Sequence, residues 1–191
     1  MEVNKLPKRH LILVGLPGAG KTTIARALSV KMDMPVIEIG SYVIAGAKEN
    51  SNFKNPLEYA DYTFKKGEYF TFVKKAFEQA KEINRYGIIL GPRLKEELYY
   101  LKDNLFNAVS VGLMVEDWVR EERRYLQTEN SEREDTLSKI RYRDQVEKSW
   151  GAEQTIKLCD YILDNHKDIN STIRQIERIL IEEGKENEFE F

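Results

Sequence analysis

The chain has 191 residues, a length that predicts one compact domain. Its 30 Lys and Arg residues nearly balance its 32 Asp and Glu residues, which argues against binding nucleic acid or a membrane through overall charge. The single cysteine, Cys159, excludes an internal disulfide framework, and the first apolar run is too short for a signal peptide or a membrane span, so we expect a cytoplasmic protein.

Short apolar runs alternate with stretches long enough for helices. In chain order, the expected elements are a strand at 11–14, a helix at 21–32, a strand at 36–39, a helix at 68–85, a strand at 87–90, a helix at 94–102, a strand at 108–115, a helix at 116–126, a weaker strand at 161–163 and an amphipathic helix at 172–183. Nearly continuous apolar strands are typical of a parallel sheet covered on both faces. The pattern predicts a three-layer α/β/α sandwich with a parallel five-stranded sheet.

The segment GLPGAGKT, at residues 15–22, matches the phosphate-binding pattern G-x-x-x-x-G-K-[ST] at every fixed position. It lies between a predicted strand and a predicted helix, which is the context that the pattern needs.

Its glycines let backbone N–H groups point at a phosphate, next to the positive end of the helix. We expect Lys21 between the β- and γ-phosphates of ATP, or of a similar triphosphate, and the Thr22 hydroxyl on Mg²⁺. The residues predicted to bind the nucleotide here are Gly15, Pro17, Gly18, Ala19, Gly20, Lys21, Thr22 and Thr23. The alternative is a glycine-rich turn that binds nothing.

A phosphate-binding loop does not name the reaction. The sequence has no N-K-x-D guanine signature, which argues against a GTPase. A length of 191 residues with no added domain argues against a motor ATPase.

Arginines gather just beyond the fourth predicted strand. They are Arg120, Arg123, Arg124, Arg133, Arg141 and Arg143. Arg120 and Arg124 are four residues apart and share one helix face. The polar segment 127–132 separates them from Arg141, so an arginine-bearing flap could close over the phosphates, neutralise the transferring group and exclude water. The alternative is a solvated helical hairpin in which neighbouring carboxylates pair with these arginines.

These segments together resemble the P-loop nucleoside monophosphate kinase superfamily, in particular adenylate-kinase-related archaeal proteins and dephospho-CoA kinases. The resemblance covers residues 10–182. It rests on GLPGAGKT, on GIILGPRLKEE at 87–97, on VREERR at 119–124, on IRYRDQ at 140–145 and on CDYILDN at 159–165.

The resemblance implies a role for several residues. Arg120 and Arg124 look like lid arginines, with Arg120 also over the adenine. Arg141 and, as a second candidate, Arg143 look like the returning arginines. Asn165 resembles the position beside the nucleobase, and Arg93 the residue that faces the acceptor's phosphate. Residues 41–72 would form an acceptor-binding insertion whose aromatic side chains, Tyr42 among them, could line a pocket. Residues 116–145 would form a helical lid within a single domain over 1–184, followed by an acidic tail at 185–191.

Two acidic residues that the superfamily usually carries are absent. The chain reads Gly40-Ser41-Tyr42 after the second strand and Leu90-Gly91-Pro92-Arg93 after the third. The first loss counts against a hydroxyl acceptor, which needs a base, and the second weakens support for Mg²⁺. Glu38, Glu96 and Glu97 are candidate substitutes.

We therefore predict an enzyme that moves the γ-phosphoryl group of ATP, with Mg²⁺, to a nucleotide or another small phosphorylated acceptor. Lys21, Arg120, Arg124 and Arg141 are its predicted catalytic residues, and Arg93 and Tyr42 are predicted to bind the acceptor. One alternative is a catalytically degenerate nucleotide-binding protein that signals by lid closure. A further alternative is an ATPase associated with nucleic acid, which the balanced charge disfavours. The sequence leaves the acceptor and the oligomeric state open.

Overall fold

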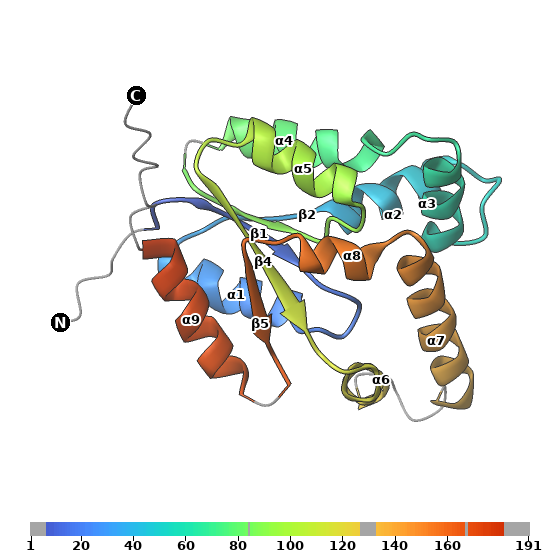
Figure 1. The fold of residues 1–191 in the computed structure, drawn as a ribbon. Coiled ribbons are helices and arrows are strands. Elements are labelled where there is room, and N and C mark those ends of the chain that lie inside the picture. Colours follow the sequence, from blue (N-terminus) through green and yellow to red (C-terminus); the bar gives the residue numbers. More distant parts are fainter. Residues whose placement is uncertain (1–6, 84, 127–132, 167, 182–191) are drawn as a thin grey trace.

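The computed structural model describes residues 7–83, 85–126, 133–166 and 168–181. Its strands are β1 (His10–Val14), β2 (Val36–Glu38), β3 (Ile88–Leu90), β4 (Ala108–Met114) and β5 (Tyr161–Asp164). They form one parallel sheet in the order β2-β3-β1-β4-β5 (Figure 1). The central strand β1 pairs on both sides, with Leu13 opposite Leu90 and Val111. The predicted parallel five-stranded sheet is confirmed.

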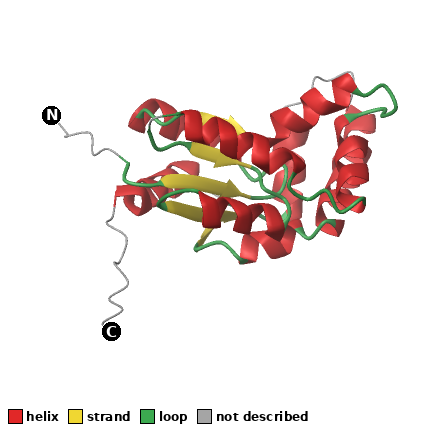
Figure 2. Ribbon diagram, turned by 90° about the horizontal axis from the view of Figure 1, so that it is seen from above, coloured by secondary structure: helices red, strands yellow, loops and turns green. Residues whose placement is uncertain are grey.

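Helices cover both faces of this sheet, as Figure 2 shows from above. They are α1 (Lys21–Met32), α2 (Ile39–Glu49), α3 (Pro56–Lys65), α4 (Thr71–Glu82), α5 (Lys95–Asn104), α6 (Asp117–Leu126), α7 (Arg133–Ser149), α8 (Ala152–Lys157) and α9 (Ile169–Ile181). Side chains alternate along β1: Leu11 and Leu13 pack toward α1 and α9, and Ile12 and Val14 toward α4 and α5. This two-sided burial explains why the strands are apolar at nearly every position.

The segment between β2 and β3 is more helical than we predict from the sequence. The helix expected at 68–85 is shorter, and α2 and α3 precede it. The Asn55 side chain caps α3 by accepting a hydrogen bond from the Glu58 backbone N–H at 3.0 Å, and Pro56 begins the helix. In α2, a Cβ atom at Gly46 would lie 2.6 Å from the Tyr59 ring. Tertiary packing of α2 on α3 therefore requires a residue that lowers intrinsic helix propensity.

The chain returns to the sheet through α6, α7 and α8. Helix α6 follows the end of β4, and α7 leads through α8 to the edge strand β5 (Figure 1). The predicted polar segment at 127–132 and the predicted acidic tail at 185–191 lie outside the described residues. Among the helices that the structure describes, none has the length and apolar character that crossing a membrane requires.

Candidate nucleotide-binding site

The P-loop, residues 15–22, connects the end of β1 to the start of α1 as the motif predicts. Gly18 and Gly20 have φ values of 81° and 92°, which side-chain-bearing residues rarely adopt. A Cβ atom at Gly18 would lie 2.7 Å from the Arg120 carbonyl oxygen. Both the backbone conformation and the close approach of a neighbouring segment therefore require glycine at this position.

Lys21 folds back over the loop. Its Nζ donates to the carbonyl oxygens of Gly15 at 2.5 Å and Leu16 at 3.0 Å. Burial lowers the pKa of Lys21 to about 8, an effect that the negative charge of Glu147 opposes. The ammonium group thus lies at the loop in an enclosed place, where a phosphate would be a stronger partner than two carbonyl groups.

A cavity of about 650 Å³ opens in front of the P-loop. Among the described residues, its charged lining consists of Lys21, Arg93, Arg123, Arg124, Arg143, Glu38 and Glu147. Five cations against two carboxylates leave a formal surplus of three positive charges in this part of the structure. The arginines come from the loop after β3, from α6 and from α7, so three segments far apart in the sequence supply them. The lining suits a polyanion such as a nucleoside triphosphate.

Comparison with known proteins places the chain in a family. A family model described as an AAA domain matches residues 14–141, about two thirds of the chain. The chain belongs to this family, within the P-loop nucleoside monophosphate kinase-like superfamily. A search of curated proteins found no match.

Several solved structures share this fold. A shikimate kinase from Bacteroides thetaiotaomicron is 18% identical with a TM-score of 0.58, covering 90% of this chain and 98% of its own. A shikimate kinase from Aquifex aeolicus is 16% identical with a TM-score of 0.55, covering 87% and 93%. A gluconokinase from Sinorhizobium meliloti is 14% identical with a TM-score of 0.57, covering 92% and 93%. At these identities the likeness shows the P-loop kinase-like fold alone.

Arg120 is buried beside the P-loop and does not line the cavity in which we predict a lid arginine. Its side chain is 1% exposed and is not part of the P-loop cavity lining. It donates to the Pro17 carbonyl oxygen at 2.9 Å, to Asp144 at 2.7 Å and to Asp117 at 2.5 Å. It also lines a separate cavity of about 830 Å³ between α6, α8 and the ends of β4 and β5. Arg120 therefore ties the P-loop to α6 and α7 and lies outside the lining of the P-loop cavity.

The other predicted lid arginine, Arg124, does line the P-loop cavity. Arg120 and Arg124 share a helix face, as their spacing predicts, because both form ion pairs with Asp144. Burial lowers the pKa of Arg124, and the positive charge of Arg143 lowers it further. Two neighbouring cations on the wall of one cavity favour an anionic ligand between them.

Arg141 points away from the cavity. Its side chain is 63% exposed and forms an ion pair with Glu121 at 3.0 Å. Arg143, two residues further along α7, lines the cavity instead. Residues two apart on a helix point in nearly opposite directions, since each residue turns the helix by about 100°. Of the two candidates for the returning arginine, the structure therefore places Arg143 at the cavity and Arg141 outside its lining.

Asn165 is fully buried behind the P-loop. Its Nδ2 donates to the Ala19 carbonyl oxygen at 2.9 Å, and its Oδ1 accepts from Thr172 at 3.0 Å. The Asn165 side chain supports the loop, and its place beside the base stays a prediction. Arg123 lies at this end of the cavity and donates to the Asn165 and His166 carbonyl oxygens at 2.8 Å and 3.0 Å. Arg123 belongs to the predicted arginine cluster, but its spacing indicates no separate role.

Two residues were predicted to bind the acceptor, and the structure separates them. Arg93 lines the cavity beside Gly40, where a Cβ atom would lie 3.6 Å from the Arg93 Nη2. Tyr42 is not part of this lining, and its hydroxyl donates to Gln79 on α4 at 2.5 Å. Arg93 is therefore in place to bind an anionic group, whereas Tyr42 joins two helices.

Thr22 and Thr23 are exposed at the start of α1 and line the cavity. Thr22 lines the space where the phosphates of a triphosphate would supply further oxygen ligands, so its hydroxyl is a chemically suitable ligand for Mg²⁺. Within the described part of the chain, no group of three or more His, Cys, Asp or Glu side chains forms a metal site by itself. Any ion held here would depend on oxygen atoms from the nucleotide.

The candidate acidic substitutes also separate. Glu38, at the end of β2, lines the cavity. Glu97 is buried on α5, where its Oε2 accepts from the backbone N–H groups of Arg93 at 2.7 Å and Leu94 at 3.2 Å. Burial raises the pKa of Glu97 to about 7. Glu97 thus orders the start of α5. Neither Glu97 nor its neighbour Glu96 is part of the cavity lining, so Glu38 is the candidate substitute that lies at the site.

Glu147 is a second carboxylate of the cavity and is not among the site residues predicted from the sequence. It lies on α7 one turn after Arg143 and pairs with it at 2.9 Å. The i,i+4 spacing of Arg143 and Glu147 was a signal for this pair. That the pair faces the P-loop depends on how α7 packs.

Proposed function

We propose that this protein transfers the γ-phosphoryl group of ATP to a nucleotide or another small phosphorylated acceptor, in the cytoplasm. The observation that carries this proposal is the P-loop cavity, where arginines from three segments converge on a complete phosphate-binding loop. Phosphoryl transfer depends mainly on positioning and on neutralising the charge spread over the transferred group. A cavity with surplus positive charge around Lys21 provides both.

The donor side consists of the P-loop and the start of α1. Backbone N–H groups of the loop and Lys21 would bind the phosphates, and Thr22 would hold Mg²⁺. Mg²⁺, when bound, would offset the negative charge of the phosphate oxygens. Arg123 would lie toward the nucleoside, because it contacts the backbone after β5 at that end of the cavity.

The acceptor side consists of the walls formed by Arg93, Glu38 and Gly40. Residues 41–72 begin beside this wall, and we propose them as the acceptor-binding part of the single domain. Arg124 and Arg143 belong to the proposed lid, 116–145, and face the cavity from α6 and α7. They would neutralise the phosphoryl group in transit and help to exclude water.

The alternative is a nucleotide-binding protein without transfer activity. It is favoured by Leu90, an apolar residue that lines the cavity where the superfamily usually carries a carboxylate. Such a protein would bind ATP and close its lid without consuming the nucleotide.

A panel of acceptors separates these functions. Nucleoside monophosphates, dephospho-CoA, shikimate and gluconate would each be incubated with ATP and Mg²⁺, the last two because the fold neighbours carry their names. The proposal predicts transfer to a phosphorylated acceptor that Lys21→Ala abolishes. Lys31→Ala, which removes an exposed lysine of the same helix paired with Glu177, is the control and should retain activity. ATP binding without transfer to any acceptor supports the alternative, and transfer to shikimate or gluconate alone contradicts the phosphorylated acceptor.

A further inference from the structure

Glu147 is a buried carboxylate on the wall of a cavity that is otherwise suited to anions. Its residue exposure is 3%, and it lines the P-loop cavity from α7. Its Oε1 accepts a hydrogen bond from Arg143 Nε at 2.9 Å and lies 3.5 Å from Arg93 Nε. One oxygen atom therefore joins the arginine of the acceptor wall to the arginine of the lid.

The charge state of Glu147 follows from these partners. Burial raises its pKa, but the positive charges of Arg93, Arg143 and Lys21 together lower it by more, so the net pKa lies below the usual value. Glu147 is therefore an anion at neutral pH. Its charge keeps two guanidinium groups side by side that would otherwise repel each other.

A fixed anion in this place has a cost for ligand binding. A carboxylate beside two arginines repels a phosphate that approaches the same pair, so it weakens binding of the substrate before transfer. The same carboxylate restricts the rotamers of both arginines, which is a benefit when the reacting groups must be aligned. Only interactions that are stronger in the transition state than with the bound substrate raise the rate of the chemical step.

We propose that Glu147 is a positioning residue of the transfer site, which aligns Arg93 with Arg143 and limits how tightly this pair binds an anion before transfer. Its effect on turnover rests on the proposed function, whereas its effect on anion binding does not. Glu147 acts through the arginines and does not itself contact the transferred group.

The test compares Glu147→Gln, which keeps the shape and removes the charge, with Glu147→Asp, which keeps the charge and shortens the side chain. Inorganic phosphate is titrated calorimetrically into the nucleotide-free protein, and kcat and KM are measured with any acceptor that the panel identifies. Glu147→Gln should bind phosphate about tenfold more tightly, because one repelling charge is removed. Its kcat should fall by about tenfold or more while the acceptor KM does not rise. Glu147→Asp should keep the wild-type phosphate affinity and lose kcat.

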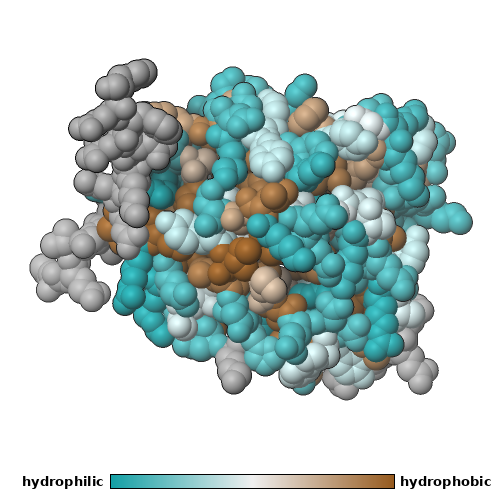
Figure 3. All heavy atoms as spheres, in the orientation of Figure 1, coloured by the Kyte–Doolittle hydropathy of each residue, from teal (hydrophilic) through white to brown (hydrophobic). Residues whose placement is uncertain are grey.

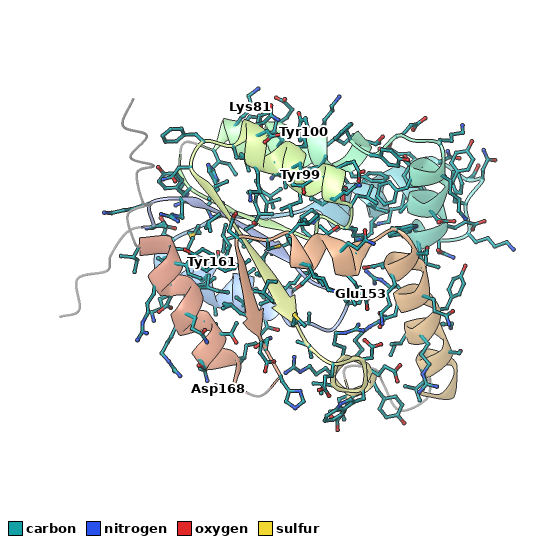
Figure 4. All side chains as sticks on the ribbon, viewed as in Figure 1. Lys81, Tyr99, Tyr100, Glu153, Tyr161 and Asp168 are labelled. Atoms are coloured by element: carbon teal, nitrogen blue, oxygen red, sulfur yellow. The ribbon has the colours of Figure 1, made fainter. Side chains whose placement is uncertain are left out.

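Glu153→Gln is the matched control. Glu153 lies on α8, labelled in Figure 4, and is an exposed glutamate that pairs with Lys148. It should leave phosphate affinity, kcat and KM unchanged. Adding Arg93→Ala to Glu147→Gln should remove the gain in phosphate affinity, which assigns that gain to the arginine pair.

Each result bears on the proposal in one direction. Unchanged or weaker phosphate binding by folded Glu147→Gln overturns it, as does an acceptor KM that rises with unchanged kcat. If circular dichroism shows Glu147→Gln unfolded, Glu147→Asp decides: weakened phosphate binding overturns the proposal, and wild-type binding supports it. If the wild-type protein transfers phosphate to no acceptor but Glu147→Gln binds phosphate more tightly, the proposed function fails and the role of Glu147 in limiting anion binding stands.

Discussion

The side-chain Nδ2 of Asn165 lies 2.5 Å from the position that a Cβ atom on Gly20 would take. The same amide donates to the Ala19 carbonyl oxygen, so Asn165 fills the space that the missing side chain of Gly20 leaves. The last glycine of the P-loop motif is thereby explained twice, by its φ of 92° and by this contact. The loop that faces the phosphates is shaped from behind by a residue that follows the last strand.

Asn165→Ala should therefore reduce both stability and ATP affinity. It removes hydrogen bonds to Ala19 and Thr172 and leaves a buried carbonyl group unpaired, which costs about 1–3 kcal/mol. Urea denaturation and calorimetric ATP titration would measure the two effects. Asn104→Ala is the control, because that exposed amide bonds to Tyr100 within α5. Equal effects of the two substitutions would show that Asn165 does not support the loop.

Arg120→Ala should act mainly on stability. The substitution leaves Asp144 without its closest cationic partner, and breaking a buried ion pair costs about 3–5 kcal/mol. ATP affinity should fall as a consequence, because Pro17 in the P-loop loses a donor. A variant with wild-type stability and lost transfer would instead support the catalytic role that the resemblance implied for Arg120.

Arg143→Ala and Arg141→Ala form a matched pair on one helix. Arg143→Ala should reduce kcat/KM by about 100-fold or more, since it removes a cation that faces the transferred group. Arg141→Ala should change activity less than about twofold and stability by less than about 1 kcal/mol, because its ion pair is exposed. Steady-state kinetics distinguish them. The reverse order of effects would place the returning arginine at 141, as the sequence pattern suggests.

Deprotonation of Glu97 should lower the free energy of unfolding as pH rises from about 5 to 7. Burial raises the pKa of this carboxyl group from its ordinary value of 4.5 to about 7, so the folded state binds a proton that the unfolded state releases. The stabilisation is complete below the unfolded pKa and is lost as pH rises through the folded pKa. A shift from 4.5 to about 7 corresponds to a total on the order of 3 kcal/mol.

Glu97→Gln should flatten this dependence, because the amide can still accept from the backbone N–H groups of Arg93 and Leu94 and does not titrate. Urea denaturation at several pH values would measure it. Glu96→Gln, the more exposed neighbour, is the control. A pH profile of Glu97→Gln identical to that of the wild type would exclude Glu97 as its source.

Local sequence patterns were sufficient to predict the sheet and the position of the P-loop. Helix α1 begins and ends where we predict from the sequence, because a glycine turn precedes Lys21 and the apolar period ends at Met32. Helix α2 has no comparable signal: its first residue, Ile39, also continues the apolar run of β2, and its N-cap side chain makes no capping hydrogen bond. Its existence depends on contacts with α3 and α4.

The arginines show why site prediction is harder than fold prediction. Spacing alone places Arg120 and Arg124 on one helix face, correctly. It could not predict that Arg120 would be buried in an ion pair with Asp144 while Arg124 reaches the cavity. The choice between Arg141 and Arg143 depends on the rotation of α7 about its own axis. That rotation is set by packing against α6 and α8, which no short segment encodes.

The partly exposed edge strand β5 gives the fold an open side. Tyr161 and Ile162 are 40% and 43% exposed, and Figure 3 shows apolar surface on this face. Backbone groups on the free edge of such a strand can pair with a strand of another chain. At high protein concentration, we therefore expect aggregation to occur by self-association through β5. Ile162→Lys would be the simplest substitution to suppress it.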